Sequence, residues 1–178
     1  MRLALAKPWQ ISHWLNTTNP ITQESLLGKV VLLDVFQMLC PGCVSHALPQ
    51  AMRVAQAFNP ADIAVIGLHS VFENHNAQGS KETLAAFLHE YKIDFPVGID
   101  SPDASGRLPQ TMASYGLQGT PTTILIDRRG NLRKQKFGFE ADLVLGAEIM
   151  SLILEPHERL YETGQSNCDD AGCAVPTE

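Results

Sequence analysis

The pattern of apolar and polar residues along the chain switches repeatedly between two periods. Continuous apolar runs are typical of buried strands, whereas apolar residues that recur every three or four positions are typical of helices. Residues 30–36 form a nearly continuous run of aliphatic and β-branched residues, which predicts a buried central strand. Residues 41–58 have the helical spacing, and Pro49 inside this segment predicts a kink in the helix.

The same alternation continues through the rest of the chain. It predicts strands over residues 63–68, 95–99, 122–127 and 132–137, and helices over residues 80–91, 109–115 and 140–154. The polar residues 74–79 are expected to form a loop, and residues 128–131 to form the turn of a hairpin. Strands that alternate with helices, followed by a hairpin and a helix, predict an α/β domain with a mixed central sheet and helices on both faces.

The two ends of the chain differ from this central part. Trp9, Ile11 and Trp14 are large apolar residues, and they suggest an N-terminal extension that packs on the domain. Beyond residue 156 the composition becomes small and polar, which is typical of a flexible tail. We therefore predict one domain over residues 1–156 and a C-terminal tail over residues 157–178.

Composition and charge disfavour some classes of partner. The chain has 178 residues, of which 44% are hydrophobic, and this suits one domain with an ordinary packed core. Its formal net charge of -6 argues against nucleic acid as a partner. The basic residues between positions 128 and 136 surround the predicted hairpin turn, where we interpret them as a solvated surface.

No segment of the sequence is suited to crossing a membrane. The N-terminus begins like a secretory signal, but its apolar stretch ends at Lys7 and Pro8, and no other window approaches the roughly 18 to 20 apolar residues of a membrane span. We therefore predict a cytoplasmic protein with no membrane partner, or a periplasmic one if the chain begins after a removed signal. Four cysteines in a reducing cytoplasm favour catalytic or metal chemistry over structural disulfides.

The cysteine pair Cys40-Pro41-Gly42-Cys43 directly follows the predicted central strand and opens the predicted helix. A thiol at the first turn of a helix faces unpaired backbone N–H groups and the positive end of the helix dipole, and both favour the thiolate. The pKa of a thiol in such a setting falls from roughly 8.5 to roughly 3.5–7.5, and the thiolate is the species that attacks disulfides. The sequence therefore predicts a redox-active dithiol that works without a cofactor.

Three motifs in this order resemble a known family. They are Leu-Gly-Lys-Val-Val-Leu at residues 27–32, the cysteine pair, and the segment 115–127, which contains Gly-Thr-Pro-Thr before a strand. Over residues 20–154 the chain resembles the thioredoxin superfamily, in the TlpA-like and redoxin branch that is related to AhpC/TSA proteins. The resemblance implies a thioredoxin-like fold and a thiol-disulfide oxidoreductase. It implies substrates that are disulfide- or thiol-bearing proteins or small molecules, and leaves the reductant or oxidant, the working direction and the oligomeric state open.

The resemblance also implies the roles of the two cysteines. Cys40 is the exposed nucleophile that forms a mixed disulfide with the substrate. Cys43, one helical turn later, is the buried thiol that resolves this mixed disulfide. The intervening Pro41 and Gly42 tune the reduction potential of the pair, which spans roughly -270 to -120 mV among couples of this fold.

A substrate groove beside the dithiol is a further implication of the resemblance. Thr120 and Pro121 form its wall, with the bond between them in the cis form, and Pro41 and Gly42 complete it. X-Pro bonds are the ones for which the cis form is energetically accessible. Without the resemblance, Pro121 reads as an ordinary turn proline that opens an edge strand.

The chain departs from the family pattern next to the dithiol. Leu39 and His46 stand where related proteins often have Trp and an acidic residue. His46 is a candidate for proton transfer or thiolate stabilisation, and alternatively an ordinary residue of the helix surface. His69, Glu73 and His75 follow a strand at the sheet end where ligands often bind, but their spacing has no regular metal pattern, so a polar loop is favoured over a metal site.

The predicted tail carries a second cysteine pair, Cys168 and Cys173. One hypothesis is a relay that exchanges disulfides with Cys40 and Cys43 at high effective concentration. A second is a metal site with the neighbouring aspartates, and a third is that the two thiols have no role. We favour the relay and predict no metal.

Two other functions are kept as alternatives. In a thiol peroxidase, Cys43 or Cys40 forms a sulfenic acid with peroxide, and Arg107 or Arg133 polarises the peroxide. Peroxiredoxins have Thr or Ser three residues before the peroxidatic cysteine, where this chain has Cys40 before Cys43, and this argues against a peroxidase. A binding module without catalysis would hold a thiol partner in the groove beside Pro121.

Overall fold

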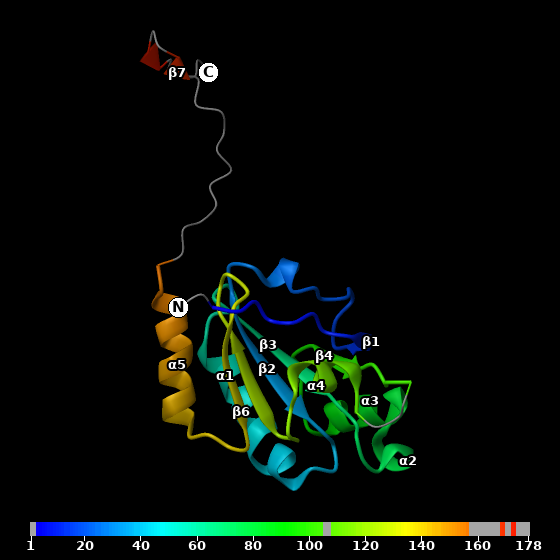
Figure 1. Cartoon of the computed structure of the whole chain (residues 1–178). Helices are drawn as coiled ribbons and strands as arrows, with labels where there is room; N and C mark the ends of the chain where they lie inside the picture. Colours follow the sequence, from blue (N-terminus) through cyan, green and yellow to red (C-terminus); the bar gives the residue numbers. More distant parts are fainter. Residues whose placement is uncertain (1–2, 105–107, 157–167, 170–171, 174–178) are drawn as a thin grey trace.

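The centre of the protein is a six-stranded sheet with helices on both faces (Figure 1). The structure is a computed structural model, and it describes residues 3–104, 108–156, 168–169 and 172–173. The strand order is β1-β4-β3-β2-β5-β6. The strands are Ile11–Leu15 (β1), Val30–Phe36 (β2), Ile63–His69 (β3), Val97–Asp100 (β4), Thr122–Ile126 (β5) and Leu132–Phe137 (β6). β2, β3 and β4 pair in parallel, and the remaining neighbours pair antiparallel, so the sheet is mixed as predicted.

The helices follow the predicted order with shifted ends. They are α1 (Leu48–Ala57), α2 (His75–Gln78), α3 (Lys81–Glu90), α4 (Gln110–Tyr115) and α5 (Asp142–Leu154), with a 3-10 turn at Glu24–Leu26. Ser80 caps α3, since its hydroxyl accepts a hydrogen bond from the Thr83 backbone N–H at 3.0 Å. Gly116 ends α4 with a left-handed φ of 63°, a conformation that glycine adopts without steric cost.

Strand β2 is the core of the sheet because it lies between β3 and β5 and is covered on both faces. All seven of its residues are buried, and alternate side chains enter two apolar clusters. The cluster on one face joins β2 to α1, α3 and α5. The cluster on the other face joins it to α4 and to Trp9, Ile11 and Trp14 of the N-terminal segment. These contacts place the C-terminal end of β2, and the cysteine pair after it, on a rigid scaffold.

The structure corrects one local prediction and adds detail to two others. Residues 74–79 contain the one-turn helix α2, and the N-terminal segment adds β1 to the edge of the sheet beside β4. The pairing of β1 depends on β4, some eighty residues away, so no local pattern shows it. The kink expected at Pro49 is a π turn over Cys43–Ala47, in which the Leu48 N–H donates to the Cys43 carbonyl. Pro49 then lies in the first turn of α1, directly after the π turn, where a proline is tolerated.

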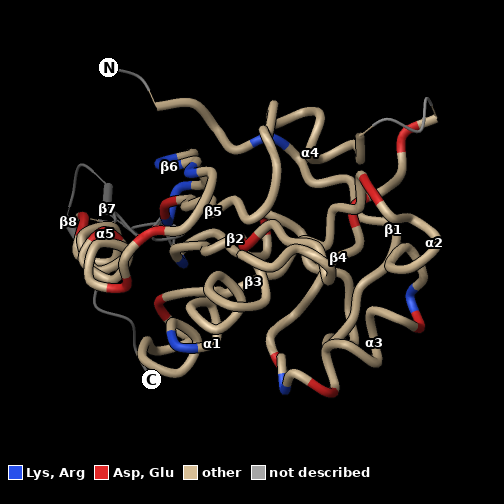
Figure 2. The backbone as a smooth tube through the Cα atoms, turned by 90° about the horizontal axis from the view of Figure 1, so that it is seen from below, with Lys and Arg blue, Asp and Glu red and all other residues tan. Residues whose placement is uncertain are grey.

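Several of the basic residues around the hairpin are paired with acidic residues rather than simply solvated. Figure 2 shows Lys and Arg on β6 next to acidic residues of α5. Lys134 binds Glu140 and Glu148, and Arg133 binds Glu155 at 2.6 Å. Both cations are largely shielded from solvent. This network ties the edge strand β6 to α5.

The far end of the chain is described only as a short backbone pair. β7 (Cys168–Asp169) and β8 (Gly172–Cys173) pair antiparallel, with Cys168 opposite Cys173. The rest of the predicted tail, residues 157–167 and 174–178, lies outside the described residues. Within the described part of the chain, none of the helices is both long and apolar enough to span a membrane.

Candidate active site

The cysteine pair lies where β2 passes into the helix. Cys40 follows the loop after β2, and Cys43 opens the π turn. Both thiols are free, but Cys40 is partly exposed while Cys43 is fully buried, at 0% exposure. The backbone N–H of Cys43 donates a hydrogen bond to the sulfur of Cys40 at 3.2 Å. This is the backbone N–H contact that the placement of the pair at a helix start predicts.

The loop before β5 closes over the pair. The Thr120–Pro121 peptide bond is cis, and the Cys40 thiol donates to the Thr120 carbonyl with 3.5 Å between sulfur and oxygen. A Cβ added to Gly42 would lie 3.4 Å from Cδ of Pro121, so the helix turn and the proline are in close contact. The structure thus brings Cys40, Gly42, Thr120 and Pro121 together, and Pro41 lies exposed beside them.

The environment of Cys43 favours its protonated form. Burial raises the pKa of the Cys43 thiol, and the neighbouring Cys40 thiol raises it further. Hydrogen bonds with the Gln37 backbone and the Thr120 side chain act in the opposite direction, because they stabilise the thiolate. Cys43 is therefore protonated in the reduced protein. It must lose its proton before it can attack, and its hydrogen-bond donors stabilise the thiolate that forms.

Asp34 is a buried acidic residue within the apolar run that predicts the central strand. It is 2% exposed, its Oδ2 has no hydrogen-bond partner, and burial raises its pKa to about 7. Alternation along β2 places it on the same face as Leu32 and Phe36, in the layer that contains Cys43. The sequence does contain a signal for this residue, because Asp34 is the single charged residue in a run that predicts a buried strand.

Two buried glutamines were also missed. Gln37 and Gln78 are 1% and 0% exposed, and their side chains hydrogen-bond each other behind the dithiol at 3.1 Å. Gln37 lies in the loop after β2, whereas Gln78 ends α2. Nothing in the sequence signals this pair, because buried amides have no periodic pattern and the two residues are far apart in the chain.

His46 points toward an aromatic neighbour. Its side chain is exposed, its Nδ1 lies 2.6 Å from the Ser45 hydroxyl, and its ring centroid lies 5.1 Å from that of Phe139. Phe137, Phe139 and Leu39 are about half exposed, and the Phe137 ring lies against Gly119, just before Thr120. Leu39, Phe137 and Phe139 therefore form an apolar rim near the dithiol, and proton transfer by His46 stays a prediction.

The other predicted polar groups do not join the dithiol. His69 is buried, its Nε2 has no partner, and burial lowers its pKa to about 4, while His75 is exposed. In the described ranges, no group of three or more His, Cys, Asp or Glu is arranged to hold a metal ion. Arg107, one of the two arginines considered for a peroxidase, lies outside the described residues.

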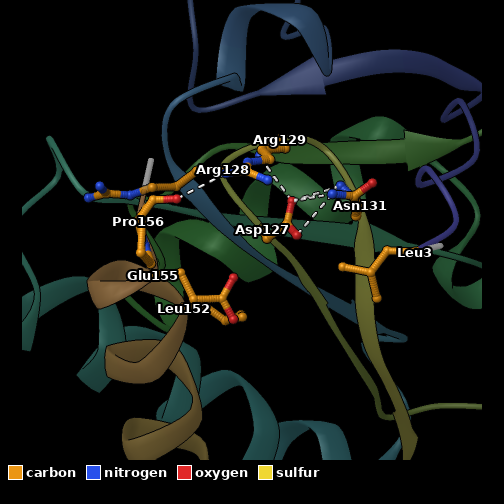
Figure 3. A pocket seen from close by; sticks show the side chains of 8 residues that line it. All are labelled: Leu3, Asp127, Arg128, Arg129, Asn131, Leu152, Glu155 and Pro156. Atoms are coloured by element: carbon orange, nitrogen blue, oxygen red, sulfur yellow. Dashed lines mark hydrogen bonds between the residues drawn. The ribbon is translucent and has the colours of Figure 1, made fainter. Parts of the chain in front are cut away.

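Arg133, the other arginine, lies at the opposite end of β5 from Thr120 and Pro121. It binds Asp127 and Glu155 there. The prediction that Arg133 polarises a peroxide at Cys43 is therefore wrong. Figure 3 shows a hollow at this end of the sheet. It is lined by Leu3, Asp127, Arg128, Arg129, Asn131, Leu152, Glu155 and Pro156. The carboxylate of Asp127 accepts hydrogen bonds from Arg129 and Asn131, so it stabilises the hairpin turn.

Known proteins resemble this chain in sequence and structure. The chain matches the AhpC/TSA family over residues 9–135. A thiol-disulfide isomerase from Corynebacterium glutamicum is 44% identical in its crystal structure, with a TM-score of 0.83 over 86% of this chain and 98% of that one. A thioredoxin-like superfamily protein of known crystal structure is 48% identical, with a TM-score of 0.84 over 87% of this chain and 99% of that one.

The first curated relatives are much longer than this chain. Protein DipZ from Mycobacterium bovis is 34% identical over 131 residues, which are 72% of this chain but only 17% of DipZ. The chain therefore corresponds to one part of that protein. The two solved structures confirm the thioredoxin-like fold that the sequence predicted.

Proposed function

The chain belongs to the AhpC/TSA family and contains a thioredoxin-fold thiol-disulfide oxidoreductase domain, and from this premise we propose that Cys40 and Cys43 exchange disulfides with thiol-bearing substrates. The observation that carries the proposal is the unequal burial of the two thiols beside the cis Thr120–Pro121 bond. A partly exposed sulfur can reach a substrate, and a buried one can meet only the sulfur of its neighbour.

The reaction follows from this arrangement. The thiolate of Cys40 attacks one sulfur of the substrate disulfide, the substrate S–S bond breaks, and the released half leaves as a thiolate that takes up a proton. Cys43 then loses its proton and attacks the Cys40 sulfur. The second substrate half leaves in the same way, so that the substrate is reduced by two electrons and Cys40–Cys43 becomes a disulfide. The reverse sequence oxidises a dithiol substrate.

Asp34 is our candidate for the group that accepts the proton of Cys43. Its carboxyl lies in the same layer of the sheet, and its pKa of about 7 lets it hold or release a proton at neutral pH. An ordinary aspartate, with a pKa of about 3.9, is too weak a base for this step. Burial of Asp34 is therefore a property that the chemistry uses.

The substrate groove and the substrates are proposals as well. The wall of the groove is the Thr120 backbone and Pro121, completed by Pro41 and Gly42, and the apolar rim favours protein substrates with apolar residues beside their cysteines. We propose an oxidising compartment, the periplasmic alternative from the sequence, because disulfides form and persist there. Cell fractionation measures the location of the protein, and recovery in the cytoplasmic fraction alone would exclude the periplasmic location.

Peptide mapping of trapped mixed disulfides tests the proposed function. Equilibration of the protein in glutathione buffers of graded potential is expected to produce one reversible Cys40–Cys43 disulfide. Cys43→Ser is expected to accumulate a mixed disulfide through Cys40, and Cys40→Ser to accumulate none. A peroxidase would instead carry a sulfenic acid on Cys43 after peroxide treatment, and a pure binding module would show no turnover in either direction.

A further inference from the structure

Two buried glutamines connect the three chain segments that surround the dithiol. Gln78, at the end of α2, reaches the loop before Cys40, and Gln37, in the loop after β2, reaches the loop before Pro121. Buried side-chain amides are stable only when their donors and acceptors are paired. The partners of these two amides determine which way each amide points.

The direction of the Gln78 amide follows from a backbone N–H, which can only donate. The N–H of Leu39 donates to Oε1 of Gln78 at 3.1 Å, so the NH₂ group of Gln78 lies on the other side. From there it donates to the Glu73 carbonyl at 2.9 Å and to Oε1 of Gln37 at 3.1 Å. Gln78 therefore presents a donor to Gln37.

The direction of the Gln37 amide follows in turn. Its Oε1 accepts from Nε2 of Gln78 and, at 3.2 Å, from the backbone N–H of Phe72. Its NH₂ group is thereby left facing the Thr120 hydroxyl oxygen, at 3.5 Å. A hydroxyl that accepts from an amide keeps its own proton free to donate elsewhere. The Thr120 side chain also acts on Cys43, because its hydrogen bonding lowers the pKa of the Cys43 thiol against the larger effect of burial.

We propose that Gln37, oriented by Gln78, is a positioning residue that turns the Thr120 hydroxyl proton toward the sulfur of Cys43. The inference rests on the proposed function and concerns its second step. In that step the Cys43 thiolate attacks Cys40, the bond from Cys40 to the substrate breaks, and the substrate leaves as a thiolate that takes up a proton. A hydroxyl that donates to Cys43 stabilises the attacking thiolate, whereas the first attack, by Cys40, does not depend on it.

Reaction with one equivalent of 5,5′-dithiobis(2-nitrobenzoate) separates the two steps. In a Cys168→Ser/Cys173→Ser background, attack by Cys40 releases one chromophore, and resolution by Cys43 releases the second. Gln37→Met is expected to leave the first phase within about twofold and to slow the second by about threefold to tenfold at pH 7, with its pH midpoint shifted upward. The slowing reflects a thiolate of Cys43 that is less stabilised and therefore less populated, partly offset by its higher nucleophilicity.

A double-mutant cycle shows whether Gln37 acts through Thr120. Thr120→Val is expected to slow the second phase, and Gln37→Met is expected to add nothing in that background, since the hydroxyl is already absent. If Gln37→Met does not fold, the second phase of Gln78→Met is measured instead. Its slowing is expected to be smaller, because the Phe72 N–H still donates to Gln37 and keeps its amide oriented. An unchanged second phase in the single variant, or equal slowing with and without Thr120, would overturn the inference.

A third glutamine provides the matched control. Gln50 on α1 is also buried, and its amide donates to the Glu140 carbonyl at 2.8 Å and to Asp142 at 2.7 Å. Gln50→Met removes a similar buried amide and is expected to leave both phases unchanged. Failure of the proposed function itself looks different, because the parent protein would then release no second chromophore at all.

Discussion

Burial distinguishes residues of the same chemical type in this protein. Cys40 and Cys43 are both thiols, but only Cys43 is buried, and burial raises its pKa. Asp34 and Asp127 differ in the same way: Asp34 lacks a partner for one oxygen and has a raised pKa, whereas hydrogen bonds from Asn131 and Arg129 lower the pKa of Asp127. Solvation and hydrogen bonding, rather than residue type, therefore set the chemistry at each position.

Asp34→Asn is expected to change the pH dependence of stability. The carboxyl titrates near 3.8 when unfolded and at about 7 when folded, so the native protein binds this proton more tightly and loses stability as the pH rises between these values. The substitution removes that loss and is expected to stabilise the protein by about 1 to 4 kcal/mol at pH 8 relative to pH 4. Urea unfolding at both pH values measures the free energy of unfolding, and the same change with pH in the two proteins would contradict the expected effect of Asp34.

The elements of the sheet fit closely around the active-site strand. In the register of β2 and β3, Gly67 lies opposite Asp34. A Cβ at Gly67 would lie 3.0 Å from Val97 and 3.1 Å from Phe36, both of which belong to the apolar core. The absence of a side chain at this position therefore lets the large ring at the end of β2 pack beneath the dithiol.

Gly67→Ala is expected to destabilise the protein by about 1 to 3 kcal/mol, because an added methyl group must displace packed side chains. The shift in the urea midpoint measures this loss. Gly146→Ala on α5 is the matched control, since nothing lies within 4 Å of a Cβ there, and a helical alanine is expected to be neutral or slightly stabilising. Equal stability of the two variants would show that β3 has room to adjust.

At the scale of the whole molecule, the question is how the dithiol connects to its redox partner. Residues opposite each other in an antiparallel pair have Cα atoms about 4.5–5.5 Å apart, which a disulfide can bridge. Cys168 and Cys173 are such a pair in β7 and β8. This backbone pairing allows the disulfide between Cys168 and Cys173 that the proposed relay to Cys40–Cys43 requires.

The relay predicts slower reduction of the Cys40–Cys43 disulfide when both tail cysteines are replaced. With dithiothreitol as the reductant, Cys168→Ser/Cys173→Ser is expected to slow this reduction by about tenfold or more, because the intramolecular dithiol and its high effective concentration are lost. Alkylation and peptide mapping over time measure the rate, and Asn167→Ser is the control. The same rate of reduction in the parent protein, the double variant and the control would show that there is no relay.

The sequence by itself determined the order of the strands from β2 to β6 and of the longer helices, the position of the cysteine pair and the motif around Pro121. These features depend on local periodicity and short spacing, which neighbouring residues encode. Only the tertiary structure decided how Asp34 titrates and that β1 joins β4. It also decided that Gln37, Gln78 and Thr120 meet, because burial and amide direction depend on atoms supplied by distant segments of the chain.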